Sequence, residues 1–262
     1  MSKIDNKQKE LLEKIKEFRL LDDDFMSKVF EDNFECIELI LHIIMQKPDL
    51  KVKEARTQYS IKNLLGRSVR LDIYAVDNIG KKYNIEVQRA DKGAGTKRAR
   101  YNSSVIDTNS LAPGSKFEDL PETYVIFITE NDVMGANEPI YHIDRLVRET
   151  GQIFDDEAHI IYVNGSYIDD SPLGLLMHDF SCKNPNDMHY KLLADKTRYF
   201  KEDEKGVAAM CKIMEDLIDN DKRESALRLL KIGKLSNEEI AEGLGLTIEV
   251  VNALEDESKS VD

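Results

Sequence analysis

Two carboxylates and one glutamine carry the strongest chemical signal in this chain, in the segment VRLDIYAVDNIGKKYNIEVQ at residues 69–88. Alternating apolar and polar residues on both sides of the loop at residues 78–80 predict a β-hairpin. With that loop centred on Ile79, residues whose numbers sum to 158 lie opposite each other, so Asp72 faces Glu86. Opposed carboxylates lie roughly 5 Å apart and repel each other. A divalent cation such as Mg²⁺, which carboxylates, water and phosphate oxygens bind, would offset that repulsion.

The alternation of the two strands also predicts which side chains share a face of the hairpin. Asp72, Glu86 and Gln88 lie on one face, and the same register places Arg70 opposite Gln88. The competing interpretation of this polar face is an exposed surface with ordinary acids, and geometry alone leaves both interpretations open. The opposite face would pack on the core through Leu71, Ile73, Ala75, Ile85 and Val87.

The charge of the chain is distributed unevenly. The net charge is −13 at pH 7, and a uniformly acidic surface would argue against a nucleic-acid partner. Residues 51–101, however, contain 13 Lys and Arg residues and 5 Asp and Glu residues, which leaves +8 in this segment and −21 in the rest of the chain. A metal site that acts on a polyanion needs basic residues around its acidic ligands, and this segment has that pattern. An ordinary solvated surface is the alternative.

The cysteines and histidines give no sign of a metal site. The three cysteines lie far apart without a CxxC spacing, so we expect them to be reduced and structural. The five histidines are scattered, and no pair stands at metal-ligand spacing beside a third donor, so no histidine-based site is expected. These residues are Cys36, Cys182, Cys211, His42, His142, His159, His178 and His189.

The composition, with 41% apolar and 33% charged residues, is typical of a soluble globular protein. A length of 262 residues allows one moderate core with an appendage. The sequence has no apolar run of about 18 residues, so we expect no membrane span. The N-terminal segment MSKIDNKQKELLEKIKEF lacks the apolar core of a signal peptide, which predicts a cytoplasmic protein.

Three helical patterns precede the hairpin. Residues 3–19 form an amphipathic pattern that predicts a flanking helix. The acids at residues 22–24 mark the start of a second helix, where they favour the helix dipole, so capping rather than metal binding is their expected role. The third helix, at residues 34–45, would bury Phe34, Ile37, Leu41 and Ile44 and place Glu35, Glu38 and His42 on a polar stripe.

The remaining patterns of the first 170 residues predict an α/β core, in which helices cover the faces of a mixed sheet. A first strand covers residues 51–60, and buried strands cover residues 123–129 and 158–163. Residues 141–150 have a helical period. A helix at residues 96–107 follows the hairpin and brings Lys97, Arg98, Arg100 and Tyr101 close to the acidic strand.

From Pro172 onward the strand signals vanish, so we divide the chain into a core at residues 1–170 and an α-helical region at residues 171–262. Ser236 and Glu239 form a capping-box pattern at the start of two short helices with the outline of a helix-turn-helix. The second of them lacks Arg and Lys up to Leu254, so packing or dimerisation is its expected role. The helical periods cover residues 188–200, 206–219, 223–232 and 235–254.

An acid on one strand, a glutamate fourteen residues later and a polar residue two further on resemble the core of PD-(D/E)xK nucleases. The chain most resembles the PD-(D/E)xK transposase family, also called recombination-promoting nucleases, over most of its length. The pattern D…NIExQ followed by R-x-x-Y is more specific than D…ExQ alone. The residues that carry the likeness are Asp24-Phe25-Met26, Val29-Phe30, Leu71-Asp72-Ile73, Tyr83 to Gln88, Arg98 to Tyr101 and the segment EEIAEGLGLT.

The resemblance implies a restriction-endonuclease-like fold and metal-dependent cleavage of DNA phosphodiester bonds in transposition or recombination. It implies that Asp72 and Glu86 bind Mg²⁺, for which Mn²⁺ can substitute. Gln88 stands where the wider superfamily has lysine, and its amide can hydrogen-bond the attacking water without adding a positive charge. More of the work then falls on the metal and on Arg98 or Arg100. The acid that the superfamily often adds from its first core helix would be Glu38, with Glu35 as the alternative.

The expected contacts to nucleic acid come from the basic segment. A function of another class is a non-catalytic module that keeps the nuclease fold and binds nucleic acid or protein; it predicts salt-sensitive DNA binding without metal. RNA in place of DNA stays open, and a homodimer that cuts two strands rests on analogy with other nucleases. The residues expected to bind nucleic acid are Arg70, Lys97, Arg98, Arg100 and Tyr101.

Overall fold

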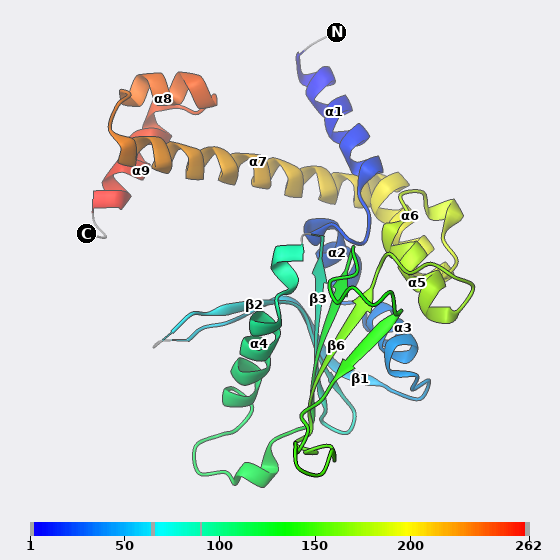
Figure 1. Cartoon of the computed structure of the whole chain (residues 1–262). Coiled ribbons are helices and arrows are strands. Elements are labelled where there is room, and N and C mark those ends of the chain that lie inside the picture. Colours follow the sequence, from blue (N-terminus) through cyan, green and yellow to red (C-terminus); the bar gives the residue numbers. More distant parts are fainter. Residues whose placement is uncertain (1–2, 64–65, 90, 260–262) are drawn as a thin grey trace. The chain divides into compact units, whose positions relative to one another are not determined.

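One mixed sheet organises residues 16–203 of the chain (Figure 1). The computed structural model describes residues 3–63, 66–89 and 91–259, with side chains described for residues 9–63, 66–89 and 93–258. The strand order in this described part is β1-β2-β3-β4-β6-β5. Strands β3, β4 and β6 are parallel, and the other pairs are antiparallel. The strands are β1 (Val52–Ile61), β2 (Val69–Asp77), β3 (Lys82–Gln88), β4 (Thr123–Thr129), β5 (Ile140–Ile143) and β6 (Ala158–Asn164).

Helices cover both faces of this sheet, which confirms the predicted α/β class. Helix α4 lies on one side of the sheet and α3 and α5 on the other (Figure 1). Every residue of β4 is buried, as expected for a central strand that is covered on both faces. The helices are α1 (Lys3–Glu17), α2 (Asp23–Phe30), α3 (Phe34–Met45), α4 (Thr96–Thr108), α5 (Pro172–Ser181), α6 (Lys191–Glu202), α7 (Glu204–Ile232), α8 (Asn237–Leu244) and α9 (Ile248–Lys259). Short 3-10 turns lie at Asp91–Ala94, Phe117–Asp119 and Pro185–Asp187.

The hairpin between β2 and β3 has the predicted register over its first four pairs. These pairs run from Val76 opposite Lys82 to Ile73 opposite Ile85, and their residue numbers sum to 158. Beyond Ile73, strand β2 pairs with β1 only and the end of β3 pairs with β4 only, so the predicted strand pairings of Asp72 with Glu86 and of Arg70 with Gln88 were both wrong. The two strands therefore separate at the level of the two acids.

The expectation that the hairpin has one core face and one polar face was incomplete. Alternate residues such as Ile73 and Ile85 are buried as predicted. The other face is buried too, because α4 packs its residues Ala99, Val105 and Ile106 onto it. This second core also contains Leu71, Tyr74, Val125, Phe127 and Tyr162. Asp72 and Glu86 consequently lie at the border of a second core instead of on an open surface.

Two segments differ from their predicted structure. Residues 141–150 were expected to be helical, but Ile140–Ile143 forms the edge strand β5, which hydrogen-bonds to β6. The Tyr141 hydroxyl bonds both carboxylate oxygens of Asp132 at 2.9 Å, and such tertiary contacts override a weak local period. Helix α5 was not predicted, although Ser171 caps it by accepting the Gly174 N–H and Pro172 begins it.

Most other predicted helices are confirmed within a few residues, including α3 with its predicted ends. Within α3, however, Phe34 is 38% exposed and Cys36 and Ile40 are buried in its place. All three cysteines are free, as expected, and burial raises the pKa of Cys36 to about 12. None of the described helices is both long enough and apolar enough to cross a membrane.

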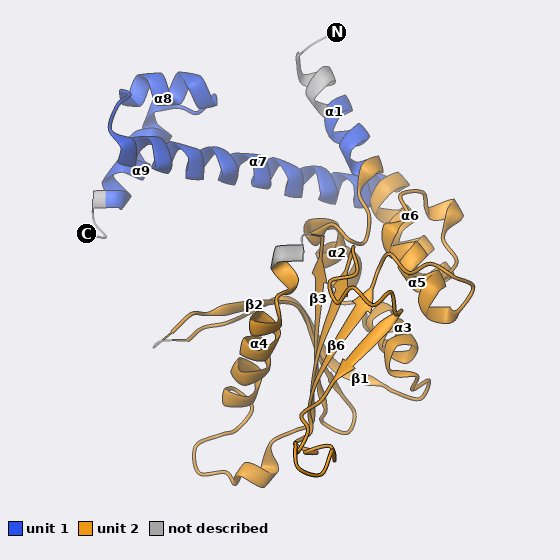
Figure 2. Ribbon diagram, viewed as in Figure 1, with its two compact units in different colours: residues 1–15, 204–262 blue, residues 16–203 orange. Residues whose placement is uncertain are grey.

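The chain divides into two compact units (Figure 2). Residues 1–15 and 204–262 form one unit, and residues 16–203 form the other. The structure thus groups α5 and α6 with the sheet, while the domain boundary at residue 170 stays a prediction. In the first unit, α8 and α9 pack on α7 around Ala226, Ile240 and Val251. The predicted capping box between Ser236 and Glu239 is present.

Candidate active site

Asp72 on β2 and Glu86 on β3 face the place where the two strands separate. Both side chains are buried, with exposed fractions of 6% for Asp72 and 0% for Glu86. The Asp72 Oδ2 atom accepts a hydrogen bond from the Val87 N–H at 2.9 Å. The Gln88 amide donates to the same oxygen at 3.4 Å. The end of the β2–β3 ladder thus places one carboxylate where it receives donors from the neighbouring strand.

Burial shifts both acids toward their neutral forms. Burial and, less strongly, the nearby charge of Glu86 raise the pKa of Asp72 to about 7. Burial also raises the pKa of Glu86, while the charge of Arg98 opposes that rise. A pair of buried carboxylates with raised pKa values is costly to ionise unless a cation joins it.

Arg98, in the first turn of α4, is the cation nearest to Glu86 among the described residues. Its Nη2 atom donates to Glu86 Oε2 at 2.6 Å, and its Nη1 atom lies 3.3 Å from Gln88 Oε1. Nη1 also donates to the Gly93 carbonyl at 3.0 Å. The Arg98 side chain is 40% exposed, whereas the Glu86 side chain is fully buried, so the guanidinium separates Glu86 from solvent.

Gly93 leaves room for the side chain of Gln88. A Cβ atom at this position would lie 2.0 Å from Gln88 Oε1, well inside van der Waals contact. Any larger residue would therefore displace the Gln88 amide from Asp72 and Arg98. Gly93 thus has a specific role in the geometry of the site.

The donor set fits a divalent cation that prefers oxygen. The Glu86 Oε1 atom is buried and has no hydrogen-bond partner within the part of the chain that the structure describes. An unpaired buried carboxylate oxygen is unfavourable, and a metal ion would satisfy it. Asp72, Glu86 and the Gln88 amide together offer carboxylate and carbonyl oxygens, which are the ligands of Mg²⁺ and Mn²⁺.

A cavity of about 1210 Å³ opens beside Asp72. It brings together all five residues that were predicted to bind nucleic acid, and it includes Gln88. Six cationic side chains and two acidic ones line it, so its wall is strongly basic although the chain is acidic. The charged lining residues are Arg67, Arg70, Arg89, Lys97, Arg98, Arg100, Asp23 and Asp72.

Several lining residues, among them Asp23, Arg67 and Arg89, were not predicted as parts of the site. Asp23, in the first turn of α2, accepts from Arg70 at 3.3 Å and from Gln58 at 2.7 Å. The charge of Asp23 also contributes to the raised pKa of Asp72. The Arg67 carbonyl accepts a hydrogen bond from the Tyr101 hydroxyl at 2.5 Å. No local spacing could have placed Asp23 here, because α2 and β2 meet only through the tertiary fold.

Glu38 does not join the other predicted ligands. Its Oε1 atom accepts from the Val52 N–H at 2.8 Å, and its Oε2 atom pairs with Lys51 at 3.0 Å. These contacts fix the start of β1 from α3, on the side of the sheet opposite α4. Neither Glu38 nor the exposed Glu35 lines the cavity at Asp72.

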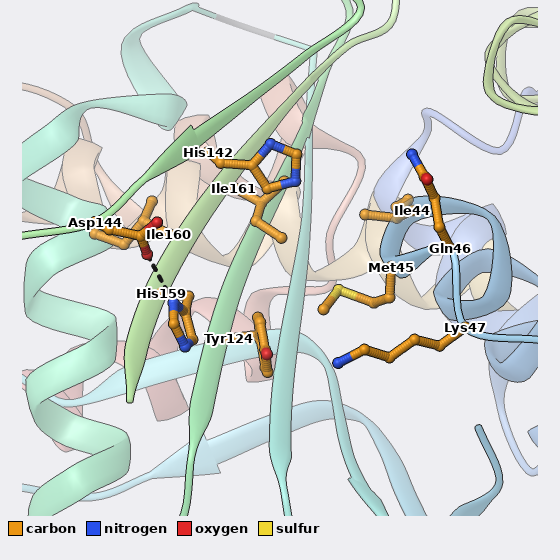
Figure 3. A pocket seen from close by; sticks show the side chains of 10 residues that line it. All are labelled: Ile44, Met45, Gln46, Lys47, Tyr124, His142, Asp144, His159, Ile160 and Ile161. Carbon is orange, nitrogen blue, oxygen red and sulfur yellow. Dashed lines mark hydrogen bonds and ion pairs between the residues drawn. The ribbon is translucent and has the colours of Figure 1, made fainter. Parts of the chain in front are cut away.

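A second cavity, of about 440 Å³, lies on the α3 side of the sheet (Figure 3). His159 stacks on Tyr124 with ring centroids 4.7 Å apart and bonds Asp144 at 2.7 Å. Lys47, from the end of α3, lies 5.8 Å from the centroid of the same tyrosine ring. These side chains interact with one another and do not share a wall with Asp72.

Comparison with known proteins identifies the family. Residues 10–169 match the family described as PD-(D/E)XK nuclease family transposase, and this segment contains the whole sheet and the cavity at Asp72. No curated protein and no solved structure shows significant similarity to the chain. Nucleases of this kind typically use a divalent metal and act on DNA. With a restriction-endonuclease-like sheet and a match over more than half of its length, the chain belongs to the PD-(D/E)XK nuclease family transposases.

Proposed function

We propose that this chain is a metal-dependent endonuclease that hydrolyses DNA phosphodiester bonds in transposition or recombination. The observation that carries the proposal is the unpaired, buried Oε1 atom of Glu86 beside Asp72. Two buried acids lower the stability of a fold. Binding of a cation during function would explain why the chain keeps both acids here. The basic cavity at the same place provides the surface for a polyanion.

Asp72 and Glu86 would hold the metal, and the carbonyl oxygen of Gln88 is a further candidate ligand. A bound Mg²⁺ or Mn²⁺ would supply a water of lowered pKa and positive charge for the phosphate oxygens. Asp72 is oriented by the Val87 N–H, so its free oxygen has a defined direction. The donor is a backbone N–H of strand β3, so this orientation does not depend on the loops around the site.

Gln88 and Arg98 would divide the role that a lysine has elsewhere in the superfamily. The Gln88 amide can orient a water by hydrogen bonding but adds no charge. Arg98 supplies the charge, because its guanidinium already bridges Glu86 and Gln88. Its partial exposure allows it to turn toward a phosphate in the cavity, where a bidentate contact is favourable.

The remaining cations would hold the DNA backbone. Arg67, Arg70, Lys97 and Arg100 line the cavity around Asp72. If they contact about four phosphates, the affinity for duplex DNA should fall with a logarithmic salt slope of about −4. Loss of one of these cations should reduce that slope by about 1 without changing the metal requirement.

Cleavage of supercoiled plasmid tests the proposal. We expect the wild type to nick DNA with Mg²⁺ or Mn²⁺ and to lose activity with EDTA. Asp72→Asn and Glu86→Gln should each lower the nicking rate at least about 100-fold, because each replaces a charged carboxylate ligand with a weakly binding neutral amide. Glu54→Gln on β1 is a matched control, since Glu54 pairs with Arg56 at the surface. Equal nicking by the wild type and both site variants would reject the assignment. Metal-independent, salt-sensitive DNA binding without cleavage would support the binding module instead.

A further inference from the structure

The end of α5 brings two imidazoles and one carboxylate together, away from the cavity at Asp72. His178 and Asp179 lie in the last turn of α5, and His189 lies between the 3-10 turn at Pro185–Asp187 and α6. One ligand atom from each of the three side chains lies within 4.8 Å of the other two. Within the described residues, this is the one group of three His, Cys, Asp or Glu side chains with such spacing.

The carboxylate of Asp179 is held in a fixed orientation by backbone donors. Its Oδ1 atom accepts from the His189 N–H and its Oδ2 atom accepts from the Tyr190 N–H, both at 2.8 Å. Each carboxylate oxygen can accept about two hydrogen bonds, so Oδ2 keeps capacity for another partner, whereas the His178 Nδ1 atom already lies 3.4 Å from Oδ1. Hydrogen bonds of this kind orient metal-binding carboxylates in proteins.

The negative charge of Asp179 is buried without a strong cationic partner. Its side chain is fully buried, and within the described chain no lysine or arginine forms an ion pair with it. The nearest group that can carry positive charge is His178, whose Nδ1 atom lies 3.4 Å from Asp179 Oδ1. Because a buried charge is costly unless it is paired, this position favours a cation.

The two histidine rings stand on the solvent side of the carboxylate. Their centroids are 4.7 Å apart in an edge-to-face arrangement. His178 is partly buried and His189 is exposed, so an ion could enter from solvent without opening the core. An exposed imidazole can also rotate, and such a rotation would adjust the distance between its nitrogen and the ion.

We propose that His178, Asp179 and His189 bind one Zn²⁺ ion. Two imidazole nitrogens and one carboxylate oxygen are typical zinc ligands, whereas Mg²⁺ prefers oxygen ligands alone. Zinc–ligand bonds of about 2.0–2.2 Å place neighbouring ligand atoms roughly 3.3 Å apart, so the side chains need to close by up to about 1.5 Å. Three protein ligands leave the fourth position to water.

The ion would fasten the end of α5 to the segment that begins α6. Asp179 already joins these two elements through the His189 and Tyr190 N–H groups. Zinc would add two bonds across the same loop and so reduce the freedom of residues 182–190. Sequence spacing argued against a histidine site because His178 and Asp179 are adjacent and His189 follows only after a turn.

Metal binding by the full chain tests this site. The measurement uses Co²⁺ as a spectroscopic probe and Zn²⁺ in calorimetry, in the Asp72→Asn, Glu86→Gln background that removes the nuclease site. We expect one equivalent of Co²⁺ with visible absorption, its displacement by one equivalent of Zn²⁺, and a higher thermal midpoint with Zn²⁺. His178→Ala and His189→Ala should each lower the Zn²⁺ affinity at least tenfold and remove the thermal shift.

His142→Ala and His159→Ala are matched controls, because these histidines lie by the cavity on the α3 side of the sheet. Both controls should bind Zn²⁺ as the parent does. Absence of Co²⁺ and Zn²⁺ binding in the parent would overturn the proposal, and so would unchanged binding in both His178→Ala and His189→Ala. Circular dichroism of each variant separates lost binding from lost folding. Since the nuclease ligands are absent from this background, neither result bears on DNA cleavage.

Discussion

Glu86 and Asp179 are both fully buried carboxylates, but the fold holds them in opposite ways. Asp179 has one backbone N–H on each oxygen. Glu86 has the partly exposed side chain of Arg98 on one oxygen and no hydrogen-bond partner on the other, within the described residues. Backbone donors cannot move away, whereas a partly exposed arginine can.

The contacts of Asp179 therefore stabilise the fold, whereas the burial of Glu86 destabilises it. The backbone donors satisfy each Asp179 oxygen in the folded state, although its charge has no lysine or arginine partner among the described residues. The burial of Glu86 is compensated only in part, which is typical of a position that exchanges partners during function. The same change of charge at the two residues should therefore have opposite effects on stability.

Asp179→Asn and Glu86→Gln should show the largest difference between the two carboxylates. Asp179→Asn turns one acceptor into a donor that faces a backbone N–H, so we expect a loss of about 2–3 kcal/mol in the free energy of unfolding. Glu86→Gln removes a poorly paired charge and should leave stability in EDTA at pH 8 unchanged or higher. Urea denaturation of both variants measures this, and equal destabilisation would refute the distinction.

Arg98→Ala tests whether the partner of Glu86 also acts on the substrate. Removal of the guanidinium leaves Glu86 and Gln88 without their shared donor, so we expect a fall of about 10- to 100-fold in the nicking rate. Lys97→Ala, one residue earlier in α4, is the control and should chiefly weaken DNA binding. A nicking rate that is unchanged in Arg98→Ala would leave the arginine with a structural role alone.

Gly93→Ala tests the placement of Gln88 without touching a charged residue. The added methyl group would overlap the Gln88 amide oxygen, so the amide has to leave Asp72 and Arg98. We expect about a tenfold lower nicking rate with a nearly unchanged thermal midpoint, because the displaced side chain is flexible. Gly95→Ala, which meets no atom within 4 Å, is the matched control. Equal rates for the two variants would show that the position of Gln88 does not matter.

The pH dependence of stability tests the raised pKa of Asp72. The pKa of Asp72 is about 7 in the folded chain and 3.8 in the unfolded chain. Between pH 3.8 and about pH 7 the carboxyl group is therefore protonated in the folded state and ionised in the unfolded state. Stability in EDTA should therefore fall as the pH rises from about 4 to about 7. Asp72→Asn should flatten this fall and raise the thermal midpoint at pH 8, because asparagine carries no charge for burial to penalise. An identical pH profile for Asp72→Asn would contradict the raised pKa.

Local patterns were sufficient to predict the hairpin and the basic helix. The register of β2 and β3 follows from the alternation around Ile79, and the four cations and Tyr101 follow from their place next to the acidic strand. The family resemblance added the expected roles of Asp72 and Glu86, which fall in the segment that the family comparison matches.

Sequence patterns could not predict the features that depend on tertiary contacts. The separation of β2 from β3 depends on the competing partners β1 and β4. Asp23 reaches the cavity only because α2 packs on β2. Residues 140–143 pair with β6 as a strand although the sequence of residues 141–150 has a helical period. The cluster at Asp179 depends on the path of the chain between α5 and α6, which no spacing rule describes.

The central claim is that Asp72 and Glu86 bind a divalent cation together, and anomalous diffraction from a crystal soaked in Mn²⁺ tests it most directly. The account predicts an anomalous peak about 2.0–2.3 Å from a carboxylate oxygen of each residue, with Arg98 turned away from Glu86. The contradicting result is no peak between the two side chains at saturating Mn²⁺ while Arg98 keeps its bond to Glu86.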